Sequence, residues 1–172
     1  MNPITKLKGL LASSHSKLCN HYIGANFQRG RDIVLDPGML YIGDNVFIGD
    51  YVRLTPNTSA ISIADGSFIQ AFCVLLAGDF ITIGCNVLIG PHTVIVSADH
   101  RFDRRDIPIT QQGLTCEWIV IQDDVWIGAH CTILKGTKIG QGSVIGAGSV
   151  VTGRVDPYSI MAGNPAKLIG KR

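Results

Sequence analysis

The chain has 172 residues and a formal net charge of +2 at pH 7, which fits a single domain and gives no reason to expect a nucleic-acid partner. Hydrophobic residues make up 46% of the chain and aromatic residues only 7%, so we expect a core of aliphatic and small side chains. No apolar run approaches the ~20 residues that span a bilayer, and no signal peptide is recognisable. Five scattered cysteines without a CxxC pair are typical of free thiols in a reducing compartment, and we expect a cytoplasmic protein.

The first segment of the chain carries an amphipathic pattern. Within residues 3–21, apolar side chains recur at helical spacing, at Ile4, Leu7, Leu10, Leu11 and Leu18. This pattern predicts a short helix that covers the first turn of the structure after it, so residues 1–22 are assigned as an N-terminal helical cap. The basic face of this helix would allow peripheral membrane contact at most.

A hexad led by an aliphatic residue recurs through residues 23–172. Three consecutive hexads make a unit of eighteen residues, and this unit is followed by a second one. The six hexads begin at Ile121, Ile127, Ile133, Ile139, Ile145 and Val151. Neither a helical stripe nor a plain alternating strand has this period. The repeat predicts an all-β solenoid, a parallel β-helix of six or seven coils with three short strands per coil. We expect the side chains at the fifth position of each hexad to point inward: Val46, Val52, Thr58, Cys73, Val87, Thr93, Val125, Cys131, Thr137, Ser143, Ser149 and Val155.

Two parts of this domain depart from the repeat. Residues 22–39 predict one or two degenerate coils. Residues 98–118 break the repeat completely, because the chain leaves one coil after Ile95 and returns to the next at Ile119. A long excursion loop in an otherwise economical solenoid is usually functional, so we expect the chemistry at this loop.

The phrases LYIGDNVFIGDYVRL, ITIGCNVLIGPHTVI and IVIQDDVWIGAHCTI, with YSIMAGNPAKLIGKR at the end, carry a family resemblance. With them, residues 36–172 resemble the hexapeptide-repeat acetyltransferases. The resemblance implies a left-handed β-helix, a hand that the repeat alone does not supply. It also implies a homotrimer with active sites between subunits, and acetyl-CoA as the co-substrate.

The excursion loop opens with SADHRFD, and its histidine, His100, is the candidate general base. Acyl transfer from a thioester to a hydroxyl needs a group that takes the hydroxyl proton, and neutral imidazole is suited to this near pH 7. An isolated histidine at the root of a loop is more often only a surface residue. The resembled family carries its catalytic histidine at the start of this loop, with Trp-Ile-Gly in the next coil, and this implies a catalytic role for His100.

Three carboxylates are candidates for binding the acceptor. Asp99 and Asp103 flank His100, and they would either orient its ring or be solvated loop charges. Asp79 matches an aspartate that contacts the sugar acceptor in the maltose and galactoside acetyltransferases. Those relatives have Asn-Phe-Asn where this chain has AFC at 71–73, which argues against a simple sugar acceptor. The loop sequence DHRFDRRDIPITQQG instead resembles the branch that acetylates cell-surface polysaccharides or their lipid-linked precursors.

The coils after the loop resemble the acyl-CoA-binding half of the family. Ala129 and Ala147 match two positions whose main chain binds the pantetheine arm, and they lie one eighteen-residue coil apart. Trp126 would line the same groove, although an outward tryptophan is equally suited to a subunit contact. The predicted contacts to the 3′-phosphate end of coenzyme A are Thr152, Arg154 and Lys167.

The sequence therefore predicts an acetyl-CoA-dependent O-acetyltransferase that modifies a sugar hydroxyl in the synthesis of lipopolysaccharide, capsule or exopolysaccharide. A smaller acceptor stays open: maltose or a galactoside, serine, or a streptogramin-type antibiotic. A metalloenzyme like the γ-class carbonic anhydrases would use His92, His100 and His130, but that class has two ligands five residues apart, and this chain has no such pair; we expect no metal. A non-catalytic scaffold is the remaining alternative.

Overall fold

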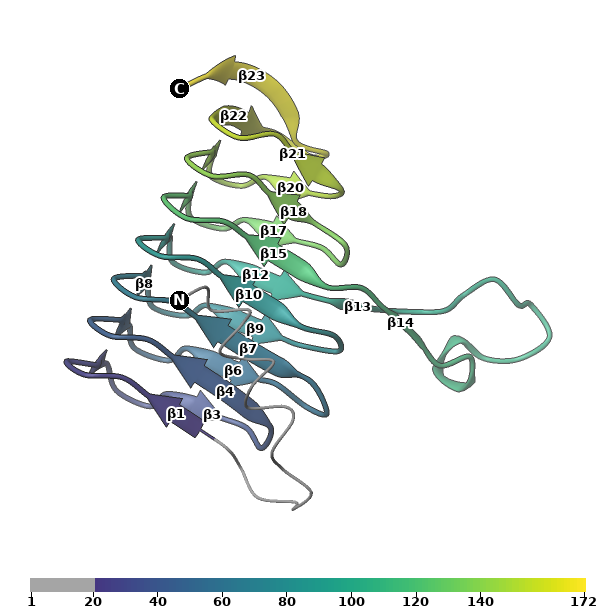
Figure 1. Cartoon of the computed structure of the whole chain (residues 1–172). Coiled ribbons are helices and arrows are strands. Elements are labelled where there is room, and N and C mark those ends of the chain that lie inside the picture. The colour runs from purple at the N-terminus through teal and green to yellow at the C-terminus, as the bar shows by residue number, and fades with distance from the viewer. Residues whose placement is uncertain (1–20) are drawn as a thin grey trace.

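The computed structural model describes residues 21–172, which form stacked coils whose short strands build three sheets, parallel except at the last strand of one of them (Figure 1). The seven-stranded sheet contains β1 (His21–Ile23), β4 (Met39–Ile42), β7 (Ala60–Ile63), β10 (Ile81–Ile83), β15 (Ile119–Ile121), β18 (Lys138–Ile139) and β21 (Arg154–Val155). The eight-stranded sheet contains β2 (Gln28–Arg29), β5 (Phe47–Ile48), β8 (Phe68–Ile69), β11 (Leu88–Ile89), β16 (Trp126–Ile127), β19 (Val144–Ile145), β22 (Ser159–Ala162) and β23 (Lys167–Lys171). The six-stranded sheet contains β3 (Val34–Leu35), β6 (Arg53–Thr55), β9 (Val74–Leu76), β12 (Val94–Val96), β17 (Thr132–Ile133) and β20 (Val150–Val151).

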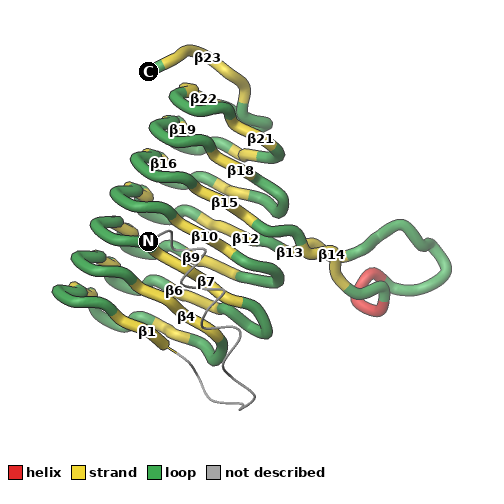
Figure 2. Tube along the Cα trace, in the orientation of Figure 1, coloured by secondary structure: helices red, strands yellow, loops and turns green. Residues whose placement is uncertain are grey.

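The excursion loop forms a separate ribbon that projects from the side of the stack (Figure 2). Its strands are β13 (Ala98–His100) and β14 (Leu114–Cys116), which pair antiparallel, and a short 3₁₀ helix, η1 (Ile109–Gln111), lies near its tip. The chain leaves the stack after β12 and rejoins it at β15, as the break in the repeat predicted. The predicted fold class, an all-β left-handed parallel β-helix with an excursion loop, is thereby confirmed.

The core is a column of aliphatic side chains that stack from coil to coil. Ile63, Ile83 and Ile121 pair in register on adjacent strands of the seven-stranded sheet, and all three are buried. Eleven of the twelve residues predicted to point inward are buried as well. The prediction for Thr58 was wrong: it is exposed, and Pro56 is buried in that corner instead.

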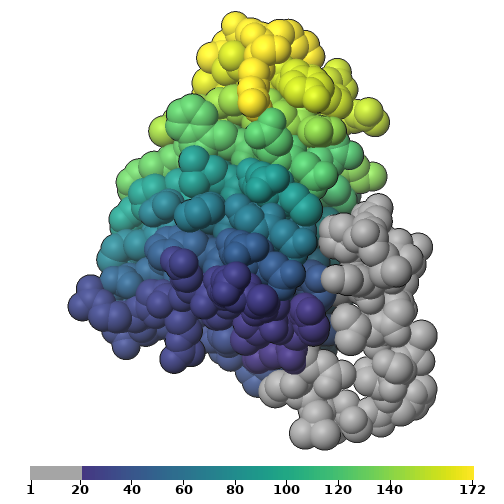
Figure 3. Space-filling model, turned by 60° about the vertical axis from the view of Figure 1, so that its left-hand side comes forward, coloured from purple at the N-terminus to yellow at the C-terminus, as the bar shows by residue number. Residues whose placement is uncertain are grey.

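The coils shorten toward the C-terminus. Ile42 pairs with Ile63, 21 residues later, whereas Ile121 pairs with Ile139, 18 residues later, and Ile139 with Val155, only 16 residues later. The eighteen-residue unit read from the sequence thus holds for the first coil after the loop, whereas the coil between Ile42 and Ile63, before the loop, is longer and the last coil is shorter. The narrowing of the stack toward its yellow end in Figure 3 follows from this difference.

The two ends of the stack differ in what the structure describes. The predicted cap, residues 1–22, lies outside the described residues except for His21 and Tyr22, which begin β1. At the other end, β23 folds back antiparallel onto β22 and closes the eight-stranded sheet. Among residues 21–172, no helix has the length and apolar character that crossing a membrane requires.

Two of the three corners of the stack carry most of the candidate site residues. The loop corner joins the six-stranded to the seven-stranded sheet and comprises residues 77–80, 97–118, 134–137 and 152–153. The groove corner joins the eight-stranded to the six-stranded sheet and comprises residues 70–73, 90–93, 128–131 and 146–149. Because each corner recurs once per coil, residues far apart in the sequence stack above one another.

Candidate active site

His100 ends strand β13 at the root of the projecting ribbon, and its side chain is exposed. The ribbon register places it opposite Leu114. The root lies close against the coil below, because a Cβ atom on Gly78 would come within 2.5 Å of the Cβ atom of Ala98. A glycine at position 78 therefore sets how closely the strand that carries His100 approaches the stack.

A hollow of about 320 Å³ lies beside this imidazole. Two of the three predicted acceptor-binding residues, Asp99 and Asp103, line it together with His100. Its remaining lining residues are Arg101, Phe102, Thr115 and Lys135. The ribbon and the coil above it thus enclose the predicted base and two carboxylates in one space.

Asp79, the third predicted acceptor-binding residue, is not among the residues that line this hollow. It lies at the loop corner one coil below the root, where its carboxylate accepts a hydrogen bond of 2.7 Å from the backbone N–H of Phe80. The hydroxyl of Ser97 accepts a bond from the Asp79 N–H and donates one to the Asp79 carbonyl. Asp79 therefore has a structural task at this corner, and acceptor binding stays a prediction.

The two carboxylates in the hollow pair with cations. Asp99 Oδ2 lies 3.8 Å from Lys135 Nζ, and Asp103 Oδ1 lies 3.7 Å from Arg101 Nε. Within residues 21–172, neither carboxylate forms a hydrogen bond with the His100 imidazole. The orienting role considered for Asp99 and Asp103 therefore stays a prediction.

Lys135 and Glu117 belong to this arrangement but were missed in the sequence. Lys135 Nζ donates a hydrogen bond of 3.0 Å to Glu117 Oε1. This bond is the main reason that the pKa of Lys135 lies above its usual value. The sequence could have indicated Lys135 only after its hexad had been assigned to the coil above the root, because that assignment places its charge at the loop corner.

The groove corner brings together three predicted cofactor-binding residues. Trp126, Ala129 and Ala147 line a groove of about 430 Å³ whose walls are mostly apolar. Ala129 and Ala147 are stacked on adjacent coils, as predicted: the Ala129 carbonyl accepts a hydrogen bond from the N–H of Gly148, the residue after Ala147. Their small side chains leave the groove open.

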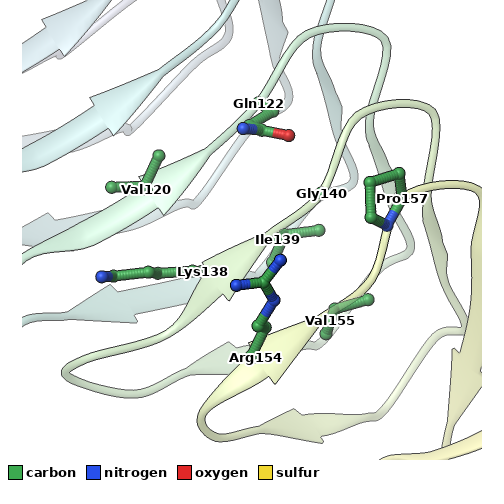
Figure 4. Close-up of a pocket in the computed structure, with 8 residues that line it drawn as sticks. All are labelled: Val120, Gln122, Lys138, Ile139, Gly140, Arg154, Val155 and Pro157. Carbon is green, nitrogen blue, oxygen red and sulfur yellow. The ribbon is translucent and has the colours of Figure 1, made fainter.

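The other predicted cofactor-binding residues lie elsewhere. Figure 4 shows Arg154 beside Lys138 in a hollow of about 200 Å³ on the seven-stranded sheet. Thr152 is exposed at the adjacent loop corner, and Arg154 also pairs with Asp156, Nε to Oδ1, across 3.3 Å. Lys167 opens β23 on the eight-stranded sheet. The structure thus brings Thr152 and Arg154 close together. Lys167 lies on a different sheet from Arg154, although its neighbour Ala166 donates a hydrogen bond to the Val150 carbonyl.

The remaining histidines form part of an aromatic ladder. At the groove corner, the rings of His92 and His130 stack with centroids 4.8 Å apart, and Phe72 stacks on His92 at the same distance. His100 lies at the other corner, away from this pair. Among the described residues, no group of three or more His, Cys, Asp or Glu side chains is placed to hold a metal ion.

Comparisons with known proteins agree with this fold. A family model described as bacterial transferase hexapeptide (six repeats) matches residues 119–153. WbbJ of Escherichia coli, named as a lipopolysaccharide biosynthesis O-acetyl transferase, is 33% identical over 158 residues, which cover 86% of this chain and 70% of WbbJ. The chain spans only about half of two other relatives named as acetyltransferases, 44% of one from Mycobacterium tuberculosis and 47% of one from Schizosaccharomyces pombe.

Two solved structures resemble the whole chain. A hexapeptide-repeat acetyltransferase from Vibrio cholerae, solved with acetyl-CoA, is 30% identical, with a TM-score of 0.63 over 98% of this chain and 85% of its own. A variant of AntD, an N-acyltransferase from Bacillus cereus solved with dTDP and coenzyme A, is 25% identical, with a TM-score of 0.72 over 100% of this chain and 92% of its own. The repeat, the coil architecture and these likenesses together show that the chain belongs to the hexapeptide-repeat acetyltransferase family.

Proposed function

We propose that this chain is an acetyl-CoA-dependent O-acetyltransferase that modifies a sugar hydroxyl in cell-surface polysaccharide synthesis. The observation that carries the proposal is the division of the site between two corners of the stack. His100 lines a hollow at the loop corner that is bordered mainly by charged residues, whereas Trp126, Ala129 and Ala147 line an apolar groove at the groove corner. The hollow suits a hydroxylated acceptor and the groove suits the pantetheine arm of the donor.

The separation of His100 from the groove within one chain bears on how copies of the chain assemble. Because the imidazole and the groove lie at different corners, the groove of a second copy of the chain supplies the thioester to His100. The ribbon that bears His100 projects away from its own stack, and two of its apolar side chains, Phe102 and Ile109, are 76% and 54% exposed. Contact with a neighbouring copy would cover these side chains, so the proposal includes a homotrimer with sites between subunits.

The reaction proceeds in a ternary complex. His100 takes the proton from the acceptor hydroxyl as the oxygen attacks the thioester carbonyl carbon, and a tetrahedral oxyanion forms. A backbone N–H beside the groove stabilises this oxyanion. Collapse breaks the carbon–sulfur bond, and the proton held by the imidazole passes to the departing thiolate of coenzyme A. The base contributes about 10²–10⁴-fold, and positioning of the two substrates supplies much of the rest.

The likeness to WbbJ over most of the chain supports a surface-glycan acceptor. The likeness to AntD, an N-acyltransferase solved with dTDP and coenzyme A, supports a second candidate, transfer to an amine on a nucleotide-linked acceptor. The two candidates need the same base and the same groove but differ in the attacking atom. A panel of acceptors separates them, because only the second would require an amino group on the acceptor.

The test is release of the coenzyme A thiol from acetyl-CoA with nucleotide sugars, lipid-linked glycans, amino-sugar nucleotides and antibiotics as acceptors. We expect turnover with a hydroxyl acceptor, and we expect His100→Ala to lower kcat by about 10²–10⁴-fold while coenzyme A affinity is retained. His21→Ala is the matched control, since His21 is an exposed histidine on the first coil. Full activity of His100→Ala would overturn the mechanism.

A further inference from the structure

Lys135 links both strands of the projecting ribbon to the coil above it. It lies between β17 and β18, and its Nζ atom is 3.0 Å from Glu117 Oε1 and 3.8 Å from Asp99 Oδ2. Asp99 lies in β13 directly before His100, and Glu117 directly follows β14. One ammonium group therefore holds a carboxylate on each side of the ribbon root.

The two sides of the root are held in different ways. The Glu117 side is fixed by backbone hydrogen bonds, because its N–H donates to the Ser97 carbonyl and its carbonyl accepts from the Gly136 N–H. On the other side, Ser97 is bonded to the coil below, through the Leu76 carbonyl and the Asp79 backbone. Asp99 itself pairs only within the ribbon, opposite Thr115, apart from its contact with Lys135. Within the described residues, Lys135 is therefore the polar side-chain contact between the stack and β13 itself, one residue before the proposed base.

The surroundings of Lys135 make this link effective. Its side chain is only 22% exposed, whereas Glu117 and Asp99 are 60% and 44% exposed. A partly buried ammonium is less screened by solvent than an exposed one. The charged groups around the hollow, besides His100 itself, are Asp99, Arg101 and Asp103 on the ribbon, and Lys135 on the coil above. Lys135 thus offsets negative charge in the hollow that His100 also lines, as well as holding the strand.

We propose that Lys135 is a positioning residue for His100, which fastens the ribbon through Asp99 and Glu117 and neutralises the carboxylate next to the base. This inference rests on the proposed function, since it takes His100 as the base. It predicts two separable effects of losing the ammonium. The imidazole is less well placed, which lowers kcat, and the uncompensated carboxylates favour its protonated form, which moves the acid limb of the pH–rate profile to higher pH.

The experiment compares Lys135→Met and Lys135→Arg with the wild type. For Lys135→Met we expect kcat to fall about tenfold or more, a KM for acetyl-CoA within about twofold of wild type, and an acid limb shifted upward by about half a pH unit. Lys135→Arg should keep most of the wild-type kcat and the wild-type position of the acid limb, because a guanidinium reaches the same carboxylates. Adding Asp99→Asn to Lys135→Met should return the acid limb toward its wild-type position without restoring kcat.

Lys171→Met is the matched control, because Lys171 also makes an ordered contact, 2.9 Å from Ser159 Oγ, but lies on β23. It should leave kcat and the acid limb unchanged. A kcat of Lys135→Met within twofold of wild type, or a loss of kcat with an unmoved acid limb, would overturn the inference.

Failure of the proposed function is distinguishable from failure of this inference. If wild-type protein transfers no acetyl group, the proposed function fails, and the NMR titration of His100 in wild type and Lys135→Met decides the inference: an upward shift of the midpoint supports it and an unchanged midpoint overturns it. If wild type is active and His100→Ala is not, an unimpaired Lys135→Met overturns the inference alone.

Discussion

The thiol of Cys73 donates a hydrogen bond of 3.2 Å to the carbonyl of Gly90 on the next coil. Ser67 occupies the equivalent inward position at another corner, where its hydroxyl donates to the Gly84 carbonyl across 2.8 Å. Both side chains are fully buried. Burial disfavours the thiolate and raises the pKa of Cys73 to about 11.

This raised pKa predicts a loss of stability in alkaline solution. In the unfolded chain the thiol ionises near its ordinary value, so the contribution of Cys73 is complete below about pH 8.5 and is lost as pH rises toward 11. The expected loss between about pH 8 and about pH 10.5 is about 2 kcal/mol in the free energy of unfolding. Urea unfolding under reducing conditions at about pH 8 and about pH 10.5 measures it, with Cys73→Ser as reference, since serine fits the same position. If the two proteins lose equal stability over this range, the assignment fails.

A second prediction concerns the corner glycines that allow the coils to stack. A Cβ atom on Gly90 would lie 2.6 Å from the backbone nitrogen of Ala129 on the coil above, and backbone cannot move aside cheaply. Gly90→Ala should therefore lower the free energy of unfolding by about 3 kcal/mol or more. Gly153→Ala is the control: its φ of +73° carries the left-handed cost of about 1 kcal/mol, but nothing lies within 4 Å of the added carbon. If denaturant unfolding shows that the two variants lose equal stability, the close approach of Gly90 to the Ala129 backbone is contradicted.

The hexad pattern was sufficient to predict the solenoid, the inward residues and the position of the loop, because each of these depends on local periodicity. The pattern wrongly predicted that Thr58 points inward, because this corner contains extra residues and the hexad register does not continue through it. It also could not reveal the contact of Lys135 with Asp99 and Glu117. That contact depends on which coils are neighbours, and the loop hides the register, since Ile83 pairs with a residue 38 positions later, Ile121.

The third prediction tests the groove corner as the donor site. Ala147 is exposed on the groove wall, so Ala147→Glu places a bulky carboxylate where the pantetheine arm would lie. We expect the KM for acetyl-CoA to rise at least about tenfold, because the added group blocks the groove and repels an anionic donor. The matched control is Ala25→Glu, which adds the same group to an exposed corner of the first coil. An unchanged KM in Ala147→Glu would place the donor elsewhere.

The central claim is that His100 of one copy acts on a thioester held in the groove of another, and subunit mixing tests it most directly. His100→Ala and Ala147→Glu proteins should each be nearly inactive alone. When equal amounts are unfolded together and refolded into trimers at random, roughly one quarter of all interfaces would pair an intact imidazole with an intact groove, and activity should return toward that fraction of wild type. Mixed trimers that stay as inactive as the two parents would contradict a site shared between copies.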